Sequence, residues 1–176
     1  MNPTADKAFK IRTANMRDLP IIAELKDKLD RHHHYSGLWP PEGGRRENLR
    51  RYRQMIRGKA DRIFVAECSP HEIVGYLTVS IRTRDCADRD FRRIAFIGEA
   101  FVEKTKRRQG VGRALVEAAA QFFSKRNIKQ VTLRNVILNR LANRFWGRLS
   151  FRPILYTRTT GISKLTRTLH ARRPHP

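Results

Sequence analysis

Hydrophobic positions along the chain fall into two kinds of pattern. In some stretches they recur every three or four residues, as on one face of an amphipathic helix, and in others they form short runs or alternate, as in strands. The clearest helical stripe follows Asp18, a residue type that caps helices well. Four helices are expected, over Asp18–Leu29, Arg46–Arg57, Val111–Lys125 and Leu141–Leu149.

The strand-like runs alternate with these helices. Strands are expected over Phe9–Thr13, Ile63–Cys68, Ile73–Thr83, Arg93–Val102, Lys129–Asn135 and Phe151–Thr159, with a short seventh strand near Leu165. Residues 32–44 and 84–91 are expected to be loops, and residues 161–176 a basic C-terminal strand or tail. This order predicts a single α/β (α+β) domain over residues 1–176, with a mixed sheet of six to seven strands and helices on both faces.

A basic, glycine-containing loop lies between the strand that ends at Val102 and the helix that begins at Val111. It reads Arg107-Arg108-Gln109-Gly110-Val111-Gly112-Arg113. Glycine lets a backbone approach a ligand closely, and the start of a helix presents unpaired N–H groups and the positive end of the helix dipole. The pattern therefore predicts a site for phosphate groups. The loop lacks the Gly-Lys-Ser/Thr of nucleotide hydrolases and the third glycine of dinucleotide-binding folds.

The chain resembles the GNAT family of acetyl-CoA-dependent N-acetyltransferases. The loop matches the family's Arg/Gln-x-x-Gly-x-Gly/Ala motif, and Asn139, Ala142, Trp146, Ser150 and Phe151 match a second block, Asn-x-x-Ala-x-x-x-Tyr-x-x-x-Gly-Phe, at the same spacing. The resemblance extends from about Ile63 to Tyr156. Two residues depart from it: Trp146 replaces the tyrosine that protonates the departing thiolate in many members, and Ser150 replaces a structural glycine.

The resemblance implies a GNAT-like fold whose central sheet is mixed and mostly antiparallel. It also implies that acetyl-CoA is the co-substrate. In the family, strand four separates from strand five, and its open backbone pairs with the pantetheine arm. The positions that match are Phe101, Val102 and Glu103, with N–H groups near Val102 as an oxyanion site. The residues expected to hold the cofactor are Phe101, Val102, Arg107, Arg108, Gln109, Gly110, Val111, Gly112, Arg113, Asn139 and Trp146. Asn139 is equally well suited to cap the helix that follows it.

The implied activity is direct attack of a primary amine on the acetyl group in a ternary complex. Alkyl amines are protonated at neutral pH, so a base is required, and Glu99 in strand four is the candidate. The alternative for Glu99 is a salt bridge to an arginine. An indole does not ionise usefully, so Tyr156 or Tyr35 is the candidate acid, unless the thiolate leaves unassisted.

The acceptor pocket is expected beside the segment after the first helix, with His33, Tyr35 and Trp39 as candidate lining residues. The run His32-His33-His34 is not expected to bind a metal. Consecutive residues converge poorly on one ion, and no acidic or cysteine partner stands at a suitable spacing. The two cysteines do not indicate a disulfide framework.

Charge is the unusual property of this chain. Its 38 Lys and Arg outnumber 16 Asp and Glu, and the 59 residues after Glu117 contain 13 Lys or Arg and no acid. Such an excess attracts polyanions and disfavours small polycationic acceptors. An arginine-biased genome or a solvated basic face explains it equally well. The excess leaves open an acetyltransferase directed at aminoacyl-tRNA or the ribosome, of the kind found among toxins in the family, and a catalytically weak module that binds CoA or nucleic acid.

The remaining expectations concern location and assembly. No run of apolar residues is long enough to span a bilayer, and residues 1–12 lack the apolar core of a secretory signal, so a cytoplasmic location is expected. The expected partners are a small-molecule or peptide amine and, through the basic surface, RNA or a ribosome. Neither a membrane partner nor a metal is expected, and a homodimer is left open.

Overall fold

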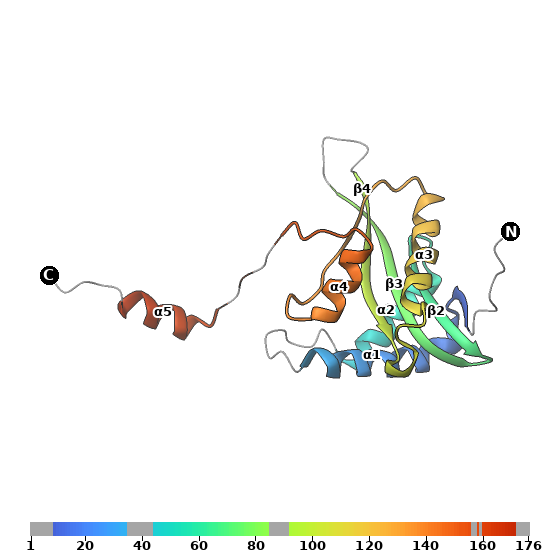
Figure 1. The fold of residues 1–176 in the computed structure, drawn as a ribbon, viewed down its shortest axis with the longest axis horizontal. Helices are drawn as coiled ribbons and strands as arrows, with labels where there is room; N and C mark the ends of the chain where they lie inside the picture. Colours follow the sequence, from blue (N-terminus) through green and yellow to red (C-terminus); the bar gives the residue numbers. More distant parts are fainter. Residues whose placement is uncertain (1–8, 35–43, 85–91, 156–157, 159, 172–176) are drawn as a thin grey trace. The chain divides into compact units, whose positions relative to one another are not determined.

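A computed structural model of the chain describes residues 9–34, 44–84, 92–155, 158 and 160–171 (Figure 1). The chain divides into two compact units, Met1–Leu138 and Asn139–Pro176, which are described separately below. The expectation of a single domain stays a prediction. In the described part of the chain, no helix has both the length and the apolar character needed to cross a membrane.

The first unit is built on a sheet of five strands in the order β1-β2-β3-β4-β5. Neighbouring strands are antiparallel except for β4 and β5, which are parallel, and this confirms the expected mixed, mostly antiparallel architecture. The strands are β1 (Lys10–Thr13), β2 (Asp61–Ser69), β3 (Glu72–Thr83), β4 (Arg93–Val102) and β5 (Val131–Leu133). Its helices are α1 (Leu19–His34), α2 (Arg45–Arg57) and α3 (Val111–Ser124), with short 3-10 turns η1 (Met16–Asp18) and η3 (Lys104–Lys106).

Alternation along β2 distributes its side chains to the two faces of the sheet. Ile63 and Val65 join a buried cluster with residues of α1 and α2, including Ile22 and Tyr52. Phe64, between them, faces the other way and packs edge-to-face on Phe122 of α3, with ring centroids 6.0 Å apart. Successive strand residues point to opposite faces of a sheet. Helices α1 and α2 therefore cover one face of this sheet and α3 covers the other, as predicted.

A bulge interrupts the pairing of β3 with β4. Leu77 pairs with Ala100, whereas Val79 pairs with Ile97, so Thr78 stands opposite both Gly98 and Glu99. The Thr78 hydroxyl accepts a hydrogen bond of 2.8 Å from the Glu99 N–H, which satisfies a backbone group displaced from the ladder. A Cβ atom at position 98 would lie 2.8 Å from Thr78 Oγ1, so the bulge requires a glycine there.

The second unit contains helices α4 (Arg140–Arg148) and α5 (Ile162–Ala171). The predicted strand over Phe151–Thr159 is wrong for its described residues, because 151–155 form no strand and Ile154 and Leu155 are exposed. Pro153, within this run, has no N–H to donate to a sheet. The short strand predicted near Leu165 is also wrong, because Ile162, Leu165 and Leu169 follow a helical spacing and lie on α5.

Smaller differences concern the ends of elements. α1 continues to His34, into the segment expected to be a loop, and β5 is limited to Val131–Leu133 rather than the expected seven residues 129–135. The sheet of the described residues therefore has five strands, fewer than the six to seven predicted. The cause is that neither apolar run in residues 151–171 joins it.

Candidate active site

Strands β4 and β5 separate halfway along β4. Their parallel pairing covers Ala95–Ile97 and Val131–Leu133 and then stops, while β4 continues to Val102 alongside β3. Beyond Ile97, the edge of β4 that faced β5 therefore has no strand partner among the described residues. Such an open strand edge can pair with an extended ligand.

The backbone of Val102 points into this opening. The next residue, Glu103, donates its N–H to the Val74 carbonyl at 2.8 Å, which makes the preceding pair, Gly75 and Val102, a non-hydrogen-bonded pair of the antiparallel ladder. The N–H and carbonyl of Val102 consequently point away from β3. Arg107 Nε donates to that carbonyl at 3.0 Å, and the Val102 N–H lies on the same open side.

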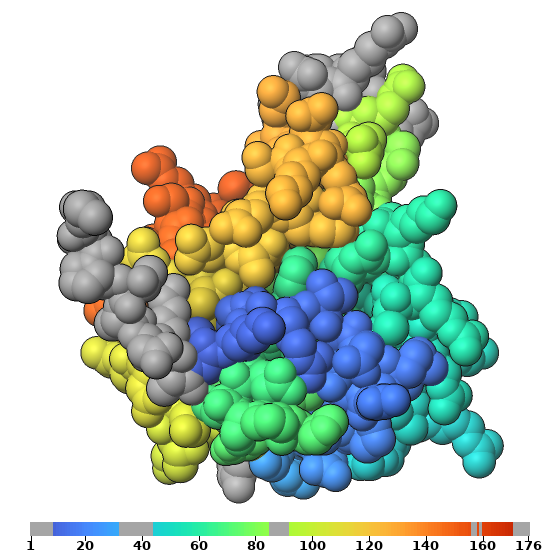
Figure 2. Space-filling model, turned by 90° about the vertical axis from the view of Figure 1, so that its right-hand side faces the viewer, coloured from blue at the N-terminus to red at the C-terminus, as the bar shows by residue number. Residues whose placement is uncertain are grey.

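The side chains of Arg107 and Gln109 stabilise the conformation of the predicted phosphate loop. Besides its bond to Val102, the Arg107 guanidinium lies over the Phe101 ring, 5.9 Å from its centroid. Gln109 Nε2 donates to the Thr105 carbonyl at 3.0 Å. The loop leads into α3 at Val111, and Figure 2 shows gold atoms of this helix on the surface. Arg107 therefore ties the beginning of the loop to the open edge of β4.

The start of α3 has the backbone geometry of an anion site. Gly110 caps the helix with φ +86°, a conformation that favours glycine, and the first intrahelical bond runs from the Ala114 N–H to the Gly110 carbonyl at 3.0 Å. The N–H groups of Val111, Gly112 and Arg113 precede that bond and have no intrahelical acceptor. Gly112 itself has ordinary helical geometry.

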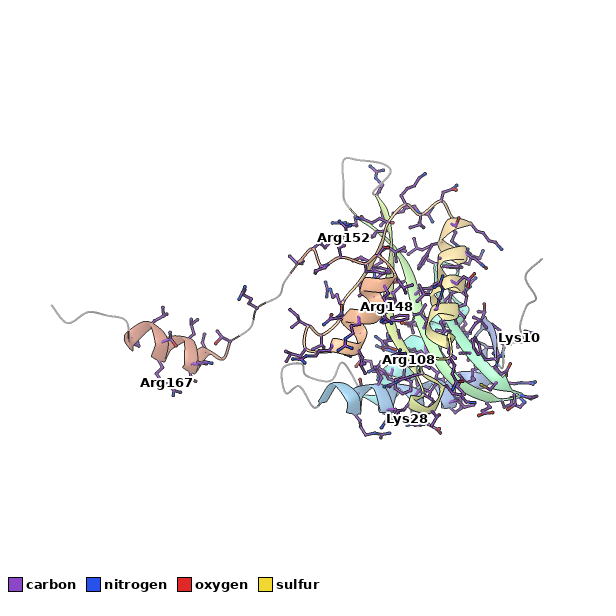
Figure 3. All side chains as sticks on the ribbon, viewed as in Figure 1. Lys10, Lys28, Arg108, Arg148, Arg152 and Arg167 are labelled. Carbon is purple, nitrogen blue, oxygen red and sulfur yellow. The ribbon has the colours of Figure 1, made fainter. Side chains whose placement is uncertain are left out.

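Two arginines beside this helix start are exposed. Arg108 and Arg113 make no hydrogen bond or ion pair with any residue in the described ranges, and Figure 3 labels Arg108 near the start of α3. Guanidinium groups pair well with phosphate oxygens. Of the three arginines proposed for the loop, these two are therefore available to a ligand, whereas Arg107 is already engaged.

Glu99 leaves the bulge toward α2 and meets three donors. Tyr52 of α2 donates to Glu99 Oε2 at 2.6 Å and Tyr76 of β3 donates to the same oxygen at 3.1 Å. Arg51 of α2 forms a salt bridge with Oε1. The Glu99 side chain is 14% exposed, so the carboxylate is largely removed from water but still reachable. The salt bridge considered from the sequence as the alternative to a base is present.

The two tyrosines are donors in this cluster at neutral pH. Burial, together with the nearby Glu99 carboxylate, raises the pKa of Tyr52 and of Tyr76 well above that of a free phenol. Their rings are in edge-to-face contact, with centroids 6.4 Å apart. Because Oε2 accepts two hydrogen bonds and Oε1 only one, Oε1 keeps a lone pair for a further donor.

Sequence reasoning missed Arg51, Tyr52 and Tyr76 as partners of Glu99. Tyr52 stands at helical spacing from Leu49 and Ile56, which predicts a buried ring, and the residue is fully buried. The signal that was available is its hydroxyl, because a buried tyrosine needs a hydrogen-bond partner. Nothing local in the sequence indicates that this partner is Glu99, 47 residues away.

Two predicted cofactor residues lie in the second unit. Asn139 caps α4, and its Oδ1 accepts a hydrogen bond of 3.0 Å from the Ala142 N–H. Trp146 is buried between the rings of Phe145 and Phe151, with centroids 4.8 and 5.3 Å away. Ser150 has φ +66°, which explains why a glycine is expected there. Contact of Asn139 or Trp146 with a cofactor stays a prediction.

The acceptor residues and the candidate acids are not located by the structure. Tyr35, Trp39 and Tyr156 lie outside the described residues, as does the side chain of His33, which belongs to the last turn of α1. Their assignment to the acceptor pocket and to thiolate protonation stays a prediction.

Comparison with known proteins gives a consistent result. The model of the Acetyltransferase (GNAT) family matches residues 28–151. This range includes the Glu99 cluster, the loop and the whole second motif block. No curated protein matches the chain.

Solved structures with similar folds include several acetyltransferases. The BH1408 protein of Bacillus halodurans superimposes with a TM-score of 0.74 at 20% identity, covering 87% of this chain and 99% of that one. AAC(6')-Iy, solved with a bisubstrate analogue, CoA-S-monomethyl-acetylneamine, gives 0.67 at 19% identity, covering 86% and 99%. The aminoglycoside acetyltransferase meta-AAC0020, from an uncultured soil metagenomic sample, gives 0.65 at 20%, covering 88% and 97%.

Proposed function

Because this chain belongs to the GNAT family of acetyltransferases, we propose that it transfers the acetyl group of acetyl-CoA to a primary amine in a ternary complex. The observation that carries the proposal is the open edge of β4 at Val102, tied by Arg107 to a loop that leads into the start of α3, where no side chain caps the helix. One ligand that has both an extended arm and phosphate groups suits the two sites together.

The residues present fit CoA. Gly110 allows the turn without a side chain over the helix start, and the N–H groups of Val111, Gly112 and Arg113 suit pyrophosphate oxygens. Arg108 and Arg113 add charge-assisted hydrogen bonds. The open N–H of Val102 suits a carbonyl oxygen that becomes negative during transfer. The thioester supplies the activated acetyl group, and the protein supplies orientation and charge.

Glu99 is the proposed acceptor of the amine proton. Its Oε1 keeps a lone pair toward which a protonated amine can donate, directly or through a water molecule. Tyr52 and Tyr76 hold the other oxygen, so the carboxylate has a defined orientation before substrate binds. Arg51 competes for Oε1, and we expect it to be displaced or shared when the amine arrives.

The departing thiolate is proposed to be protonated by Tyr156 or Tyr35, or to leave unassisted, since a thiol pKa of about 8.5 makes it an adequate leaving group. Trp146 does not serve as the acid, because an indole N–H does not ionise in the accessible pH range. We propose that its ring, in edge-to-face contact with Phe145 and Phe151, is a wall against the pantetheine arm and donates no proton.

The proposed acceptor carries a single amine and no other positive charge. Two of the similar structures are named aminoglycoside acetyltransferases, and aminoglycosides are polycations. Here the candidate base is already paired with Arg51, and the helix that carries Arg51 contains five further arginines. A polycation would be repelled by this helix, whereas a neutral or anionic amine would not.

Acetyl transfer from labelled acetyl-CoA tests the proposal. Small amines, peptides, aminoglycosides and charged tRNA would be offered together and the products separated by size. Glu99→Gln should reduce transfer at least tenfold while acetyl-CoA binding, measured by calorimetry, stays unchanged. Glu117→Gln, an exposed acid on α3, is the matched control and should retain full activity.

Two other results would contradict the proposal in different ways. Transfer unaffected by Glu99→Gln would leave an acetyltransferase whose base is water or another group. Binding of acetyl-CoA without transfer to any acceptor would favour the catalytically weak binding module instead. Label on tRNA would identify a translation-directed enzyme.

A further inference from the structure

The outer face of α2 carries a row of four arginines. Arg46, Arg50, Arg53 and Arg57 are spaced by four, three and four residues, which places them within an arc of about 60° on a helix with 3.6 residues per turn. All four are exposed. They extend along the axis for about 16 Å, at 1.5 Å per residue. We call these four residues the α2 arginine row.

In the described ranges, no acid forms an ion pair with the α2 arginine row. The two other arginines of the helix are paired, Arg45 with Asp27 and Arg51 with Glu99. The four residues of the row make no hydrogen bond or ion pair with a described residue. Like charges three or four residues apart on a helix repel one another and destabilise it. The row therefore costs stability and needs another explanation.

The fold does not require the row. The opposite face of α2 holds the helix on the protein, with Tyr52 and Asn48 buried and Leu49, Met55 and Ile56 packed against the core cluster. The site proposed for CoA phosphates lies at the start of α3 and uses the backbone there. Neither the packing of α2 nor the cofactor explains why its exposed face is arginine.

We propose that the α2 arginine row binds the phosphodiester backbone of a nucleic acid. A nucleic acid strand presents negative charges at regular intervals, and a straight row of guanidinium groups can contact several of them at once. All six cationic residues of α2 are arginine and none is lysine, which favours planar, two-point contacts with phosphate oxygens.

An anionic membrane is a poorer match to this surface. Peripheral membrane helices insert apolar side chains beside their basic ones. The apolar side chains of α2 face the core, and none is among the large exposed hydrophobic residues. The exposed face of α2 therefore provides charge without any residue to insert, as expected for a partner whose phosphates are reached from water.

The row shares its helix with two partners of the candidate base, but it lies on the other face of that helix. Arg51 and Tyr52, which contact Glu99, belong to the same helix. The binding proposal does not depend on acetyl transfer, because it concerns affinity for nucleic acid alone. Absence of enzymatic activity would leave it standing, and absence of nucleic acid binding would leave the proposed acetyl transfer standing.

Fluorescence anisotropy with the full chain tests the row. The probes are labelled 20-nucleotide single-stranded RNA, duplex RNA and duplex DNA, titrated at several NaCl concentrations. The test variant is R46Q/R50Q/R53Q. The matched control is R140Q/R144Q/R148Q, which removes the same charge from exposed arginines of α4, the helix that bears Arg148 in Figure 3.

We expect the wild type to bind in a strongly salt-dependent manner. The α2 variant should bind at least tenfold more weakly at 100 mM NaCl. The slope of its plot of log K against log[NaCl] should be less steep by about 2 to 3, because each lost phosphate contact reduces the slope by about 0.7–0.9. The α4 variant should change either quantity by much less. Tighter binding to the RNA probes or to the DNA probe would show which nucleic acid the row binds.

Three results would overturn the proposal. They are an equal loss in both triple variants, absence of binding by the wild type, and binding to phosphatidylserine vesicles without binding to nucleic acid. Thermal unfolding should show that R46Q/R50Q/R53Q is at least as stable as the wild type, since the substitutions relieve repulsion. If that variant fails to fold, Arg50→Gln alone should still lower the salt dependence by about one contact.

Discussion

The hydroxyl of Tyr52 on α2 donates a hydrogen bond of 2.6 Å to Oε2 of Glu99 at the bulge of β4. This contact joins a helix from the first third of the chain to the strand that carries the candidate base. The orientation of the Glu99 carboxylate, which is largely removed from water, therefore depends on α2. The same helix bears the α2 arginine row.

Tyr52→Phe should therefore affect both folding and catalysis. The ring stays buried while the carboxylate loses its shorter tyrosine bond, so the free energy of unfolding should fall by about 1–2 kcal/mol. The kcat of acetyl transfer should fall while KM changes little, because Glu99 is less firmly oriented. The pH profile of kcat should change as well. Tyr76→Phe removes the longer bond of 3.1 Å and should have a smaller effect on both.

A double-mutant cycle distinguishes this from a general loss of packing. Tyr52→Phe and Glu99→Gln should be strongly non-additive in urea unfolding, with a coupling of about 0.5–3 kcal/mol. Additive effects would show that the two side chains do not act on one another in solution.

Gly98→Ala should disturb the bulge that aims Glu99. The new methyl group would meet Thr78 Oγ1 at 2.8 Å, and relieving that overlap should lower the free energy of unfolding by about 1–3 kcal/mol. Gly147→Ala in α4, where an added Cβ meets nothing within 4 Å, is the control and should stabilise by about 0.5–1 kcal/mol. Equal destabilisation by both substitutions would contradict the role assigned to the bulge.

Ser150→Gly should stabilise the second unit. Ser150 has φ +66°, a left-handed conformation that costs a non-glycine residue about 1–2 kcal/mol. Glycine removes that cost but loses more entropy on folding, so we expect a net gain of about 0.5–1 kcal/mol in thermal unfolding. Ser163→Gly, within α5, should instead be destabilising. Changes in stability of the same sign for both substitutions would contradict the left-handed conformation of Ser150.

Arg12 should control stability in acid. It forms salt bridges with Asp18 at 2.6 Å and Glu67 at 2.9 Å. Its hydrogen bond lowers the pKa of Glu67 to about 2. For Asp18, burial alone would raise the pKa, but hydrogen bonds from Arg12 and Asn15 make the net change a lowering. Carboxyls with a lowered folded pKa stabilise above their unfolded pKa of about 4, and this stability disappears as pH falls toward 2.

The free energy of unfolding should therefore decrease between about pH 5 and pH 2 in the wild type. In Arg12→Gln it should be lower at pH 7 and decrease less over the same interval. Arg17→Gln, an exposed neighbour on η1, should leave the pH dependence unchanged. Parallel curves for the wild type and Arg12→Gln would exclude this network as the source of acid sensitivity.

Much of the fold could be predicted because its signals are local. The stripe of α1 and the apolar run of β2 each lie within one short segment, and the strand-loop-helix around Gly110 extends only from Arg93 to Ser124. The replacement of a structural glycine by Ser150 was also readable from motif spacing, and the positive φ agrees with it. Patterns of this kind need no knowledge of distant parts of the chain.

The errors occurred where local patterns were ambiguous. A run of apolar residues at 151–155 resembles a strand, but a strand exists only where another strand pairs with it, and no such partner is present among the described residues. Ile162, Leu165 and Leu169 have helical spacing within a short, polar segment, which was too little to distinguish a helix from a strand.

By itself, the sequence determined the helices and strands with strong periodicity, the phosphate loop with Gly110 at its turn, and the excess of positive charge, because these depend on neighbouring residues or on composition alone. Tertiary structure decided which donors meet Glu99, which arginine holds Val102, and which arginines of α2 remain unpaired. Those relationships join residues far apart in the chain, and they exist only once the sheet has paired and α2 has buried Tyr52 against it.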